Sequence, residues 1–151
     1  MNLEYEFSYR ATLKPPLDVG TGPYGARLFF EVIAGEFEGP RLKGKITSGG
    51  GDWLLVGADG FGRLDVRAQF VTEDGAAFYL RYEGLLEMNG TVQAAVSTPH
   101  GSTDYGDQYF RTCPRFETGD SRYACLNQTL FVAEGHFLPG PTVEYKVYRV
   151  V

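Results

Sequence analysis

The sequence contains few of the residues on which metal sites and disulfide frameworks depend. Among its 151 residues there are two cysteines, Cys113 and Cys125, and two histidines, His100 and His136. Two cysteines are too few for a secreted disulfide scaffold. Neither histidine belongs to the set of three or four ligands that a zinc site requires. We therefore expect no bound metal and no cofactor.

The sequence also lacks a long apolar run and an excess of basic residues. No apolar stretch approaches the roughly 20 residues of a membrane helix, and residues 1–7 have neither the basic region nor the apolar core of a signal peptide. The formal net charge of −5 disfavours nucleic acid and anionic membranes as partners, because both attract a basic surface. The expected location is cytoplasmic.

Short stretches of alternating apolar and polar residues dominate the chain and predict β-strands. The sequence has 20 glycines, and 15% of its residues are aromatic, which is typical of short strands joined by tight turns. The length is that of one domain, and no linker divides it, so we expect a single domain over residues 1–151. The expected strands are 5–13, 28–34, 42–47, 52–56, 62–72, 76–84, 108–113, 123–133 and 142–151.

Turn-forming residues separate these strands. Asp74-Gly75 favours a tight hairpin, whose core-facing residues would be Leu64, Val66, Ala68, Phe70, Phe78, Leu80 and Tyr82. Segment 14–23 is expected to be irregular, because proline lacks the N–H that a strand ladder needs. Segment 35–40 is expected to be a turn or bulge, and segment 91–97 fits either a strand or a short helix.

About nine or ten short strands at this spacing indicate an all-β sandwich or barrel. A sheet of this size has to protect its edges, and closure into a ring removes them. We therefore predict a single closed or nearly closed antiparallel barrel in which the first and last strands pair. Such a barrel has room for one small ligand. A hairpin across segment 114–122 would place Cys113 opposite Cys125 and Arg111 opposite Asn127.

Several motifs in a fixed order resemble the family known as domain of unknown function 3237. They are Gly35-x-Phe37-Glu38-Gly39-Pro40-x-Leu42-x-Gly44, Gly49-Gly50-Gly51-Asp52-Trp53, Thr72-Glu73-Asp74-Gly75-Ala76, Tyr109-Phe110-Arg111-Thr112-x-Pro114-x-Phe116-Glu117-Thr118 and Tyr123-x-x-Leu126-Asn127. The resemblance covers nearly the whole chain and implies a lipocalin-like β-barrel of open function. Where this chain has Cys125, the family pattern usually has Trp. If that Trp lines the pocket in relatives, the cavity here is larger or differently shaped.

Asp52 and Trp53 follow three glycines and are the first candidates for a site. At a pocket mouth, desolvation would raise the pKa of the Asp52 carboxyl and make it a general base. Trp53 would then give a flat wall for an aromatic substrate. The alternative is a turn in which Asp52 accepts backbone N–H bonds while Trp53 is part of the core.

Three polar side chains on one face of the expected strand pair form the second candidate. Arg111, Asn127 and Tyr109 offer a guanidinium, an amide and a phenol, which together would hold an oxygen atom of a ligand inside the barrel. Glu117 either pairs with a nearby arginine or replaces Asp52 as the acid or base. The alternative is that this face is the outside of the barrel.

Tyr123 and His100 complete the candidate ligand-binding residues. Tyr123 opens the last of the family motifs, and His100 lies in a polar, glycine-rich loop. Histidine in general titrates near neutral pH and can carry protons, although an exposed histidine in a loop is the alternative.

Three functions remain open at this point. The preferred one is a cofactor-free isomerase, cyclase or lyase that acts on a small hydrophobic, aromatic or phenolic metabolite, with Asp52, Arg111 and Glu117 as catalytic residues. The others are a non-catalytic carrier barrel and a structural homodimer whose barrel is packed solid. The barrel interior distinguishes them: several titratable groups in a cavity favour the enzyme, and a purely apolar cavity favours the carrier.

Overall fold

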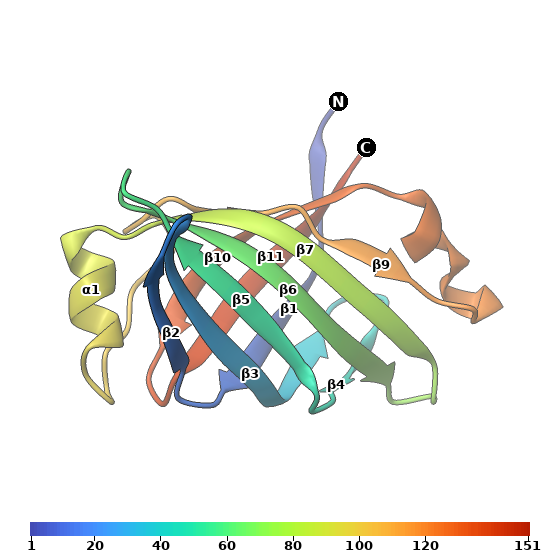
Figure 1. The fold of residues 1–151 in the computed structure, drawn as a ribbon. Helices are drawn as coiled ribbons and strands as arrows, with labels where there is room; N and C mark the ends of the chain where they lie inside the picture. The colour runs from blue at the N-terminus through green and yellow to red at the C-terminus, as the bar shows by residue number, and fades with distance from the viewer.

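The computed structural model describes residues 1–151, which form eleven β-strands, one short α-helix and one 3-10 segment (Figure 1). Neither helical segment has the length and apolar character needed to cross a membrane. The elements are β1 (Leu3–Leu13), β2 (Leu17–Gly22), β3 (Gly25–Glu38), β4 (Lys43–Ile46), β5 (Gly50–Val56), β6 (Phe61–Thr72), β7 (Ala77–Glu87), α1 (Gly90–Val96), β8 (Phe110–Thr112), β9 (Arg115–Glu117), η1 (Ser121–Gln128), β10 (Phe131–Leu138) and β11 (Thr142–Val150).

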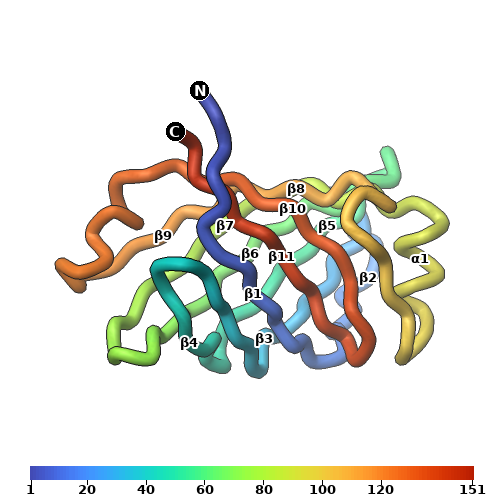
Figure 2. The backbone as a smooth tube through the Cα atoms, turned by 180° about the vertical axis from the view of Figure 1, so that it is seen from behind, coloured from blue at the N-terminus to red at the C-terminus, as the bar shows by residue number.

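The strands close into an antiparallel barrel, which confirms the predicted fold class. Eight strands form the ring in the order β1-β3-β5-β6-β7-β8-β10-β11, and β11 pairs with β1. The predicted pairing of the first and last strands is therefore correct, and the two ends of the chain lie side by side (Figure 2). Three short strands lie outside the ring: β2 pairs with β3, β4 pairs with β3 and β6, and β9 pairs with β7. The strand count exceeds the predicted nine or ten because β2 and β9 were not expected, whereas β4 is the predicted strand 42–47.

Two segments expected to be irregular are strands. Residues 17–22 form β2, because the break at Pro15 and Pro16 is local and the chain beyond it pairs with β3. Segment 35–40 was expected to turn, but β3 continues to Glu38. Gly35 lies within this strand because the neighbouring strands pack closely there: a Cβ atom would lie 2.3 Å from the carbonyl oxygen of Arg10 and 2.7 Å from Cδ1 of Ile46. Glycine permits this approach of neighbouring strands.

Two segments of the chain are helical, one as an expected alternative and one in place of an expected strand. Of the strand and the short helix that segment 91–97 fitted, the structure has the helix, α1 (Gly90–Val96), which the side chain of Asn89 caps by accepting a hydrogen bond from the N–H of Val92 at 3.0 Å. The predicted strand 123–133 is wrong in its first half, because residues 121–128 form η1.

The predicted hairpin across 114–122 is wrong for the same reason. Strand β8 pairs with β10 instead, where Arg111 lies opposite Glu134, and Cys113 and Cys125 are both free thiols.

One half of the barrel interior is filled with aromatic rings. Alternate residues of each strand point inward, and the core-facing residues predicted for the β6–β7 hairpin are all buried. The rings pack with centroid distances of 5.0 to 6.5 Å, within the range for favourable aromatic pairs. They belong to Phe7, Phe37, Phe70, Phe78 and Phe116. The other half of the interior is not filled in this way.

Candidate functional site

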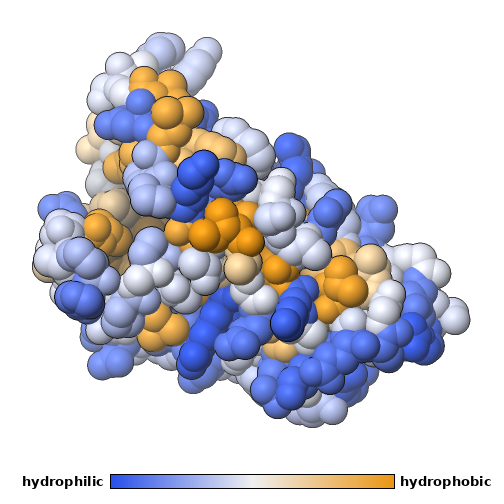
Figure 3. Space-filling model, turned by 90° about the horizontal axis from the view of Figure 1, so that it is seen from below, coloured by the Kyte–Doolittle hydropathy of each residue, from blue (hydrophilic) through white to orange (hydrophobic).

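The other half of the barrel contains a cavity of about 550 Å³ with a mostly apolar lining. Helix α1 lies beside this end of the barrel (Figure 1) and contributes Val92 and Ala95 to the wall. Exposed residues of three connections, including Pro16, Pro99 and Pro141, also line the cavity and mark its rim. Apolar side chains gather across the middle of the lower face of the molecule, between hydrophilic ones (Figure 3).

Asp52 is the one acidic residue in this lining, and no Lys, Arg or His accompanies it. It lies on β5, where its side chain and that of Leu54 point inward. Its Oδ1 accepts a hydrogen bond from the backbone N–H of Asp65 at 3.1 Å. Burial raises the pKa of Asp52 to about 7, although the hydrogen bond from Asp65 opposes the shift. Near neutral pH the carboxyl is therefore present as acid and as base in comparable amounts.

Three tyrosines lie between the cavity and the aromatic half of the core. Tyr82 and Tyr145 line the cavity, and the Tyr82 hydroxyl donates a hydrogen bond to the Tyr145 hydroxyl at 3.2 Å. The ring of Tyr9 stacks on Tyr145 at 4.8 Å, and its buried hydroxyl has no hydrogen-bond partner. Burial holds the pKa of each tyrosine well above its usual value, and the Asp52 carboxylate adds to the effect. The hydroxyls therefore remain neutral donors.

This arrangement combines a proton-transfer group with hydrogen-bond donors in an apolar space. Donors in a water-poor site stabilise negative charge that develops on an oxygen atom. A carboxyl that titrates near neutral pH suits both halves of acid–base catalysis. Because the lining has no cationic side chain, an anionic ligand would be buried without a charge partner, which is unfavourable. The cavity is thus suited to a neutral molecule.

Asp52 lines the cavity and also accepts a backbone N–H bond, as its alternative role required, whereas Trp53 does not line the cavity. Successive residues of a strand point to opposite faces, so the inward position of Asp52 sends Trp53 outward. There Trp53 is 40% exposed and packs on Phe29 with the ring centroids 4.8 Å apart. The prediction that Trp53 forms a wall of the cavity is wrong.

The prediction that Arg111, Tyr109 and Asn127 point into the barrel is also wrong. Arg111 and Tyr109 are exposed on the outer face, with the guanidinium 5.4 Å from the Tyr109 ring centroid. Their neighbour Phe110 points inward and lines the cavity. Asn127 belongs to η1, where its amide accepts a hydrogen bond from the Thr118 N–H at 2.8 Å and donates one to the Thr118 carbonyl at 2.9 Å.

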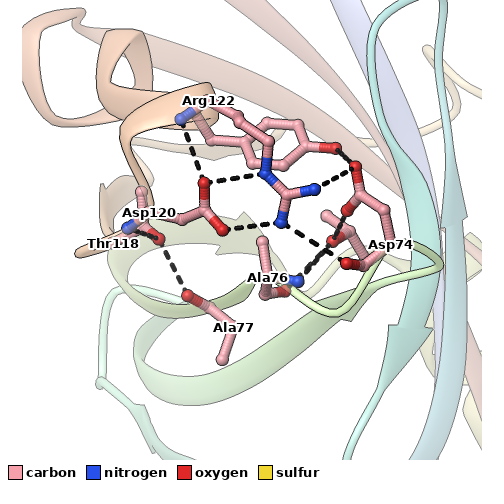
Figure 4. A network of polar contacts seen from close by, with 8 residues as sticks. Asp74, Ala76, Ala77, Thr118, Asp120 and Arg122 are labelled. Carbon is pink, nitrogen blue, oxygen red and sulfur yellow. Dashed lines mark hydrogen bonds and ion pairs between the residues drawn. The ribbon is translucent and has the colours of Figure 1, made fainter.

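The remaining candidates also lie outside the cavity. Glu117 is exposed on β9, opposite Tyr79, and His100 is exposed in the loop after α1 without lining the cavity. The Tyr123 hydroxyl donates a hydrogen bond to Asp74 at 2.7 Å. Asp74 also forms an ion pair with Arg122, so this network connects η1 to the turn between β6 and β7 (Figure 4).

The tyrosines near the cavity were not predicted as site residues, although Tyr82 was expected to face the core and the sequence carries a signal for each. Tyr9, Tyr82 and Tyr145 each occupy an inward position in a row of alternating apolar residues, such as Val143-Tyr145-Val147. A hydroxyl in such a row marks a polar group inside the barrel. The pattern does not show that these three tyrosines, which belong to different strands, come together at the same level inside the barrel.

Comparison with known proteins gives the family. The family model described as protein of unknown function (DUF3237) matches residues 1–150. The chain belongs to the DUF3237 family. A UPF0311 protein of Clostridium acetobutylicum is 32% identical over 151 residues, covering 99% of this chain and 94% of that protein.

Solved structures agree with the DUF3237 barrel. A crystal structure described as a beta-barrel like protein from Acinetobacter baumannii matches with a TM-score of 0.81 and 29% identity, covering 98% of this chain and 94% of that one. An enzyme from Penicillium herquei matches with a TM-score of 0.69 and 20% identity, covering 97% and 93%; this likeness concerns the fold alone.

The departure from the DUF3237 pattern at Cys125 does not alter the cavity. Cys125 is exposed on η1 and is absent from the cavity lining. The expectation of a changed pocket shape at this position therefore does not apply to this protein.

Proposed function

We propose that this DUF3237 protein is a cofactor-free enzyme that performs acid–base chemistry on a small, neutral, hydrophobic or phenolic molecule. The observation that carries the proposal is a carboxyl with a pKa of about 7 beside tyrosine hydroxyls in an apolar cavity. A cavity meant only to carry an apolar ligand has no need of a buried carboxyl, because burying it is unfavourable. Perturbed carboxyls in cavities are typical of functional sites.

In this proposal Asp52 moves the proton and the tyrosines hold the oxygen. The ionised carboxylate takes a proton from a carbon or hydroxyl of the substrate and returns it at another atom. The Tyr145 hydroxyl, which accepts the hydrogen bond from Tyr82, donates its own proton to the carbonyl or phenolate oxygen on which negative charge develops. The apolar walls fix the orientation of the substrate. Isomerisation, cyclisation and elimination can all proceed by such steps.

The experiment is to incubate purified protein with small-molecule extracts and to follow the components by mass spectrometry. The wild type should consume specific neutral compounds and form isomers or dehydrated products. Asp52→Asn should lose this turnover while still binding the same compounds, and Glu117→Gln, which changes an exposed carboxyl outside the cavity, should retain it. The wild-type rate should depend on a group that titrates near pH 7, as Asp52 does.

The same experiment separates the enzyme from a carrier. If compounds co-purify with the protein unchanged, and no component of the extract is converted at any pH, the proposal of catalysis is wrong and the cavity is a binding site. Turnover that Asp52→Asn leaves intact would also contradict the proposal, because it would place the chemistry elsewhere.

A further inference from the structure

An apolar row crosses the outer face of β2, β3 and β5, which lie side by side facing the viewer in Figure 1. Leu17 on β2 lies directly opposite Phe29 on β3, and Phe29 lies directly opposite Trp53 on β5. Leu17 is 66% exposed and Trp53 is 40% exposed. The Phe29 ring covers Gly51, where a Cβ atom would lie 2.4 Å from the ring. Contiguous exposed apolar surface of this kind marks interaction sites.

Two opposite charges flank the centre of this row. Arg27 and Glu31 lie two residues before and two residues after Phe29 on β3, so all three share the outer face. Arg27 donates a hydrogen bond to the Trp53 carbonyl at 2.8 Å, and the Glu31 carboxylate lies 3.5 Å from the ammonium of Lys14. The face therefore carries a positive and a negative side chain at equal distances from its apolar centre.

We propose that this face joins two copies of the chain through a two-fold axis that runs along the row from Leu17 to Trp53. Such an axis lies in the interface and reverses the direction of β3, so that the two β3 strands face each other antiparallel. Each residue of the row then meets its own copy, as an isologous contact requires. Arg27 meets Glu31 of the partner subunit, and Glu31 meets the partner's Arg27.

The neighbouring strand β5 adds an apolar contact about the same axis. Leu55 lies opposite Arg27, and Gly51 lies opposite Glu31. The rotation that pairs the charges therefore also brings Leu55 of each copy over the place where the Phe29 ring of the other copy covers Gly51, so that the two apolar side chains meet. Because the barrel surface curves away on both sides, the contact involves only these three strands and the interface is small. We therefore expect a weak dimer, with a dissociation constant on the order of 1 μM.

The first test exchanges the charges. Arg27→Glu and Glu31→Arg should each weaken the dimer at least about tenfold, because like charges would face each other across the axis. A 1:1 mixture of the two variants should form a heterodimer, since residues 27 and 31 then carry opposite charges in both contacts. A salt bridge between residues 27 and 31 of the same chain cannot explain this result, because four residues of a strand span about 13 Å. Arg115→Glu, an exposed arginine on β9, is the matched control.

The measurement is sedimentation velocity over a concentration series, with circular dichroism to establish that each variant is folded. Leu17→Asp should also dissociate the dimer, whereas Leu130→Asp, at a side chain 57% exposed on another part of the surface, should not. A wild type that is monomeric at every concentration would overturn the proposal. So would a dimer that persists in Leu17→Asp and both charge variants, or a mixture of the charge variants that forms no heterodimer.

Discussion

Replacing Asp52 with asparagine isolates the energetic effect of burying this carboxyl. The amide has nearly the same shape, and its oxygen can still accept the hydrogen bond from the Asp65 N–H. What the replacement removes is the ionisation. Asp52 has an ordinary pKa of 3.8, which burial raises to about 7. The folded protein thus retains a proton that the unfolded chain has already released.

The sign of the effect follows from this difference. Below about pH 4 the carboxyl is protonated in both states and has no effect on stability. Between about pH 4 and pH 7 the unfolded chain binds fewer protons than the folded one, so the free energy of unfolding falls by up to about 1.4 kcal/mol per pH unit. Above pH 7 the free energy of unfolding falls no further, and the full decrease is at most about 4 kcal/mol for a pKa raised from 3.8 to about 7. Water that reaches the cavity reduces this, and we expect about 1–3 kcal/mol.

Urea unfolding followed by circular dichroism measures this effect as the difference between variant and wild type. Asp52→Asn should be as stable as the wild type near pH 4 and more stable near pH 8. Asp59→Asn is the matched control, because hydrogen bonds from Arg63 lower the pKa of Asp59 to about 2 and its removal should give no gain at pH 8. An Asp52→Asn variant no more stable than the wild type at pH 8 would refute the reasoning.

Two further predictions concern packing and the network around η1. Phe70→Ala, in the centre of the aromatic half, should lower the free energy of unfolding by about 3–5 kcal/mol in urea denaturation; a loss under 1 kcal/mol would show that this half is not tightly packed. Arg122→Ala removes the ion pairs to Asp74 and Asp120 and should speed amide exchange in residues 119–129 while leaving β6 and β7 protected. Unchanged exchange in that segment would mean that the network does not hold it.

The barrel was predictable because its signal is local and repeated. The residues from Leu64 to Phe70 and from Phe78 to Tyr82 alternate in burial as they alternate in polarity. Local patterns do not show which strand is next to which over a long separation. Strand β8 pairs with β7 and β10, whereas proximity in the sequence predicted pairing with a strand that begins near Tyr123.

The candidate site was predictable in part for the same reason. Asp52 could be named as a candidate from its position on an expected strand directly after three glycines. Its surroundings could not be predicted, because they depend on Tyr82 and Tyr145, which are distant in the sequence. Trp53 follows Asp52 on the same strand, so the alternation that the sequence itself contains turns it to the outer face. Arg111 was misplaced because a polar face of an exposed strand has the same pattern as a polar face that lines a cavity.

The division of the interior into an aromatic half and a half that encloses the cavity separates two evolutionary demands. Rings such as Phe7 and Phe37 hold the barrel together at one end, so substitutions there are constrained by folding. Cavity residues such as Leu28, Val66 and Leu86 can change size or polarity at lower risk, since the space beside them is already open. A barrel built in this way can acquire a new ligand specificity by a few wall substitutions while the end that determines its foldability stays unchanged.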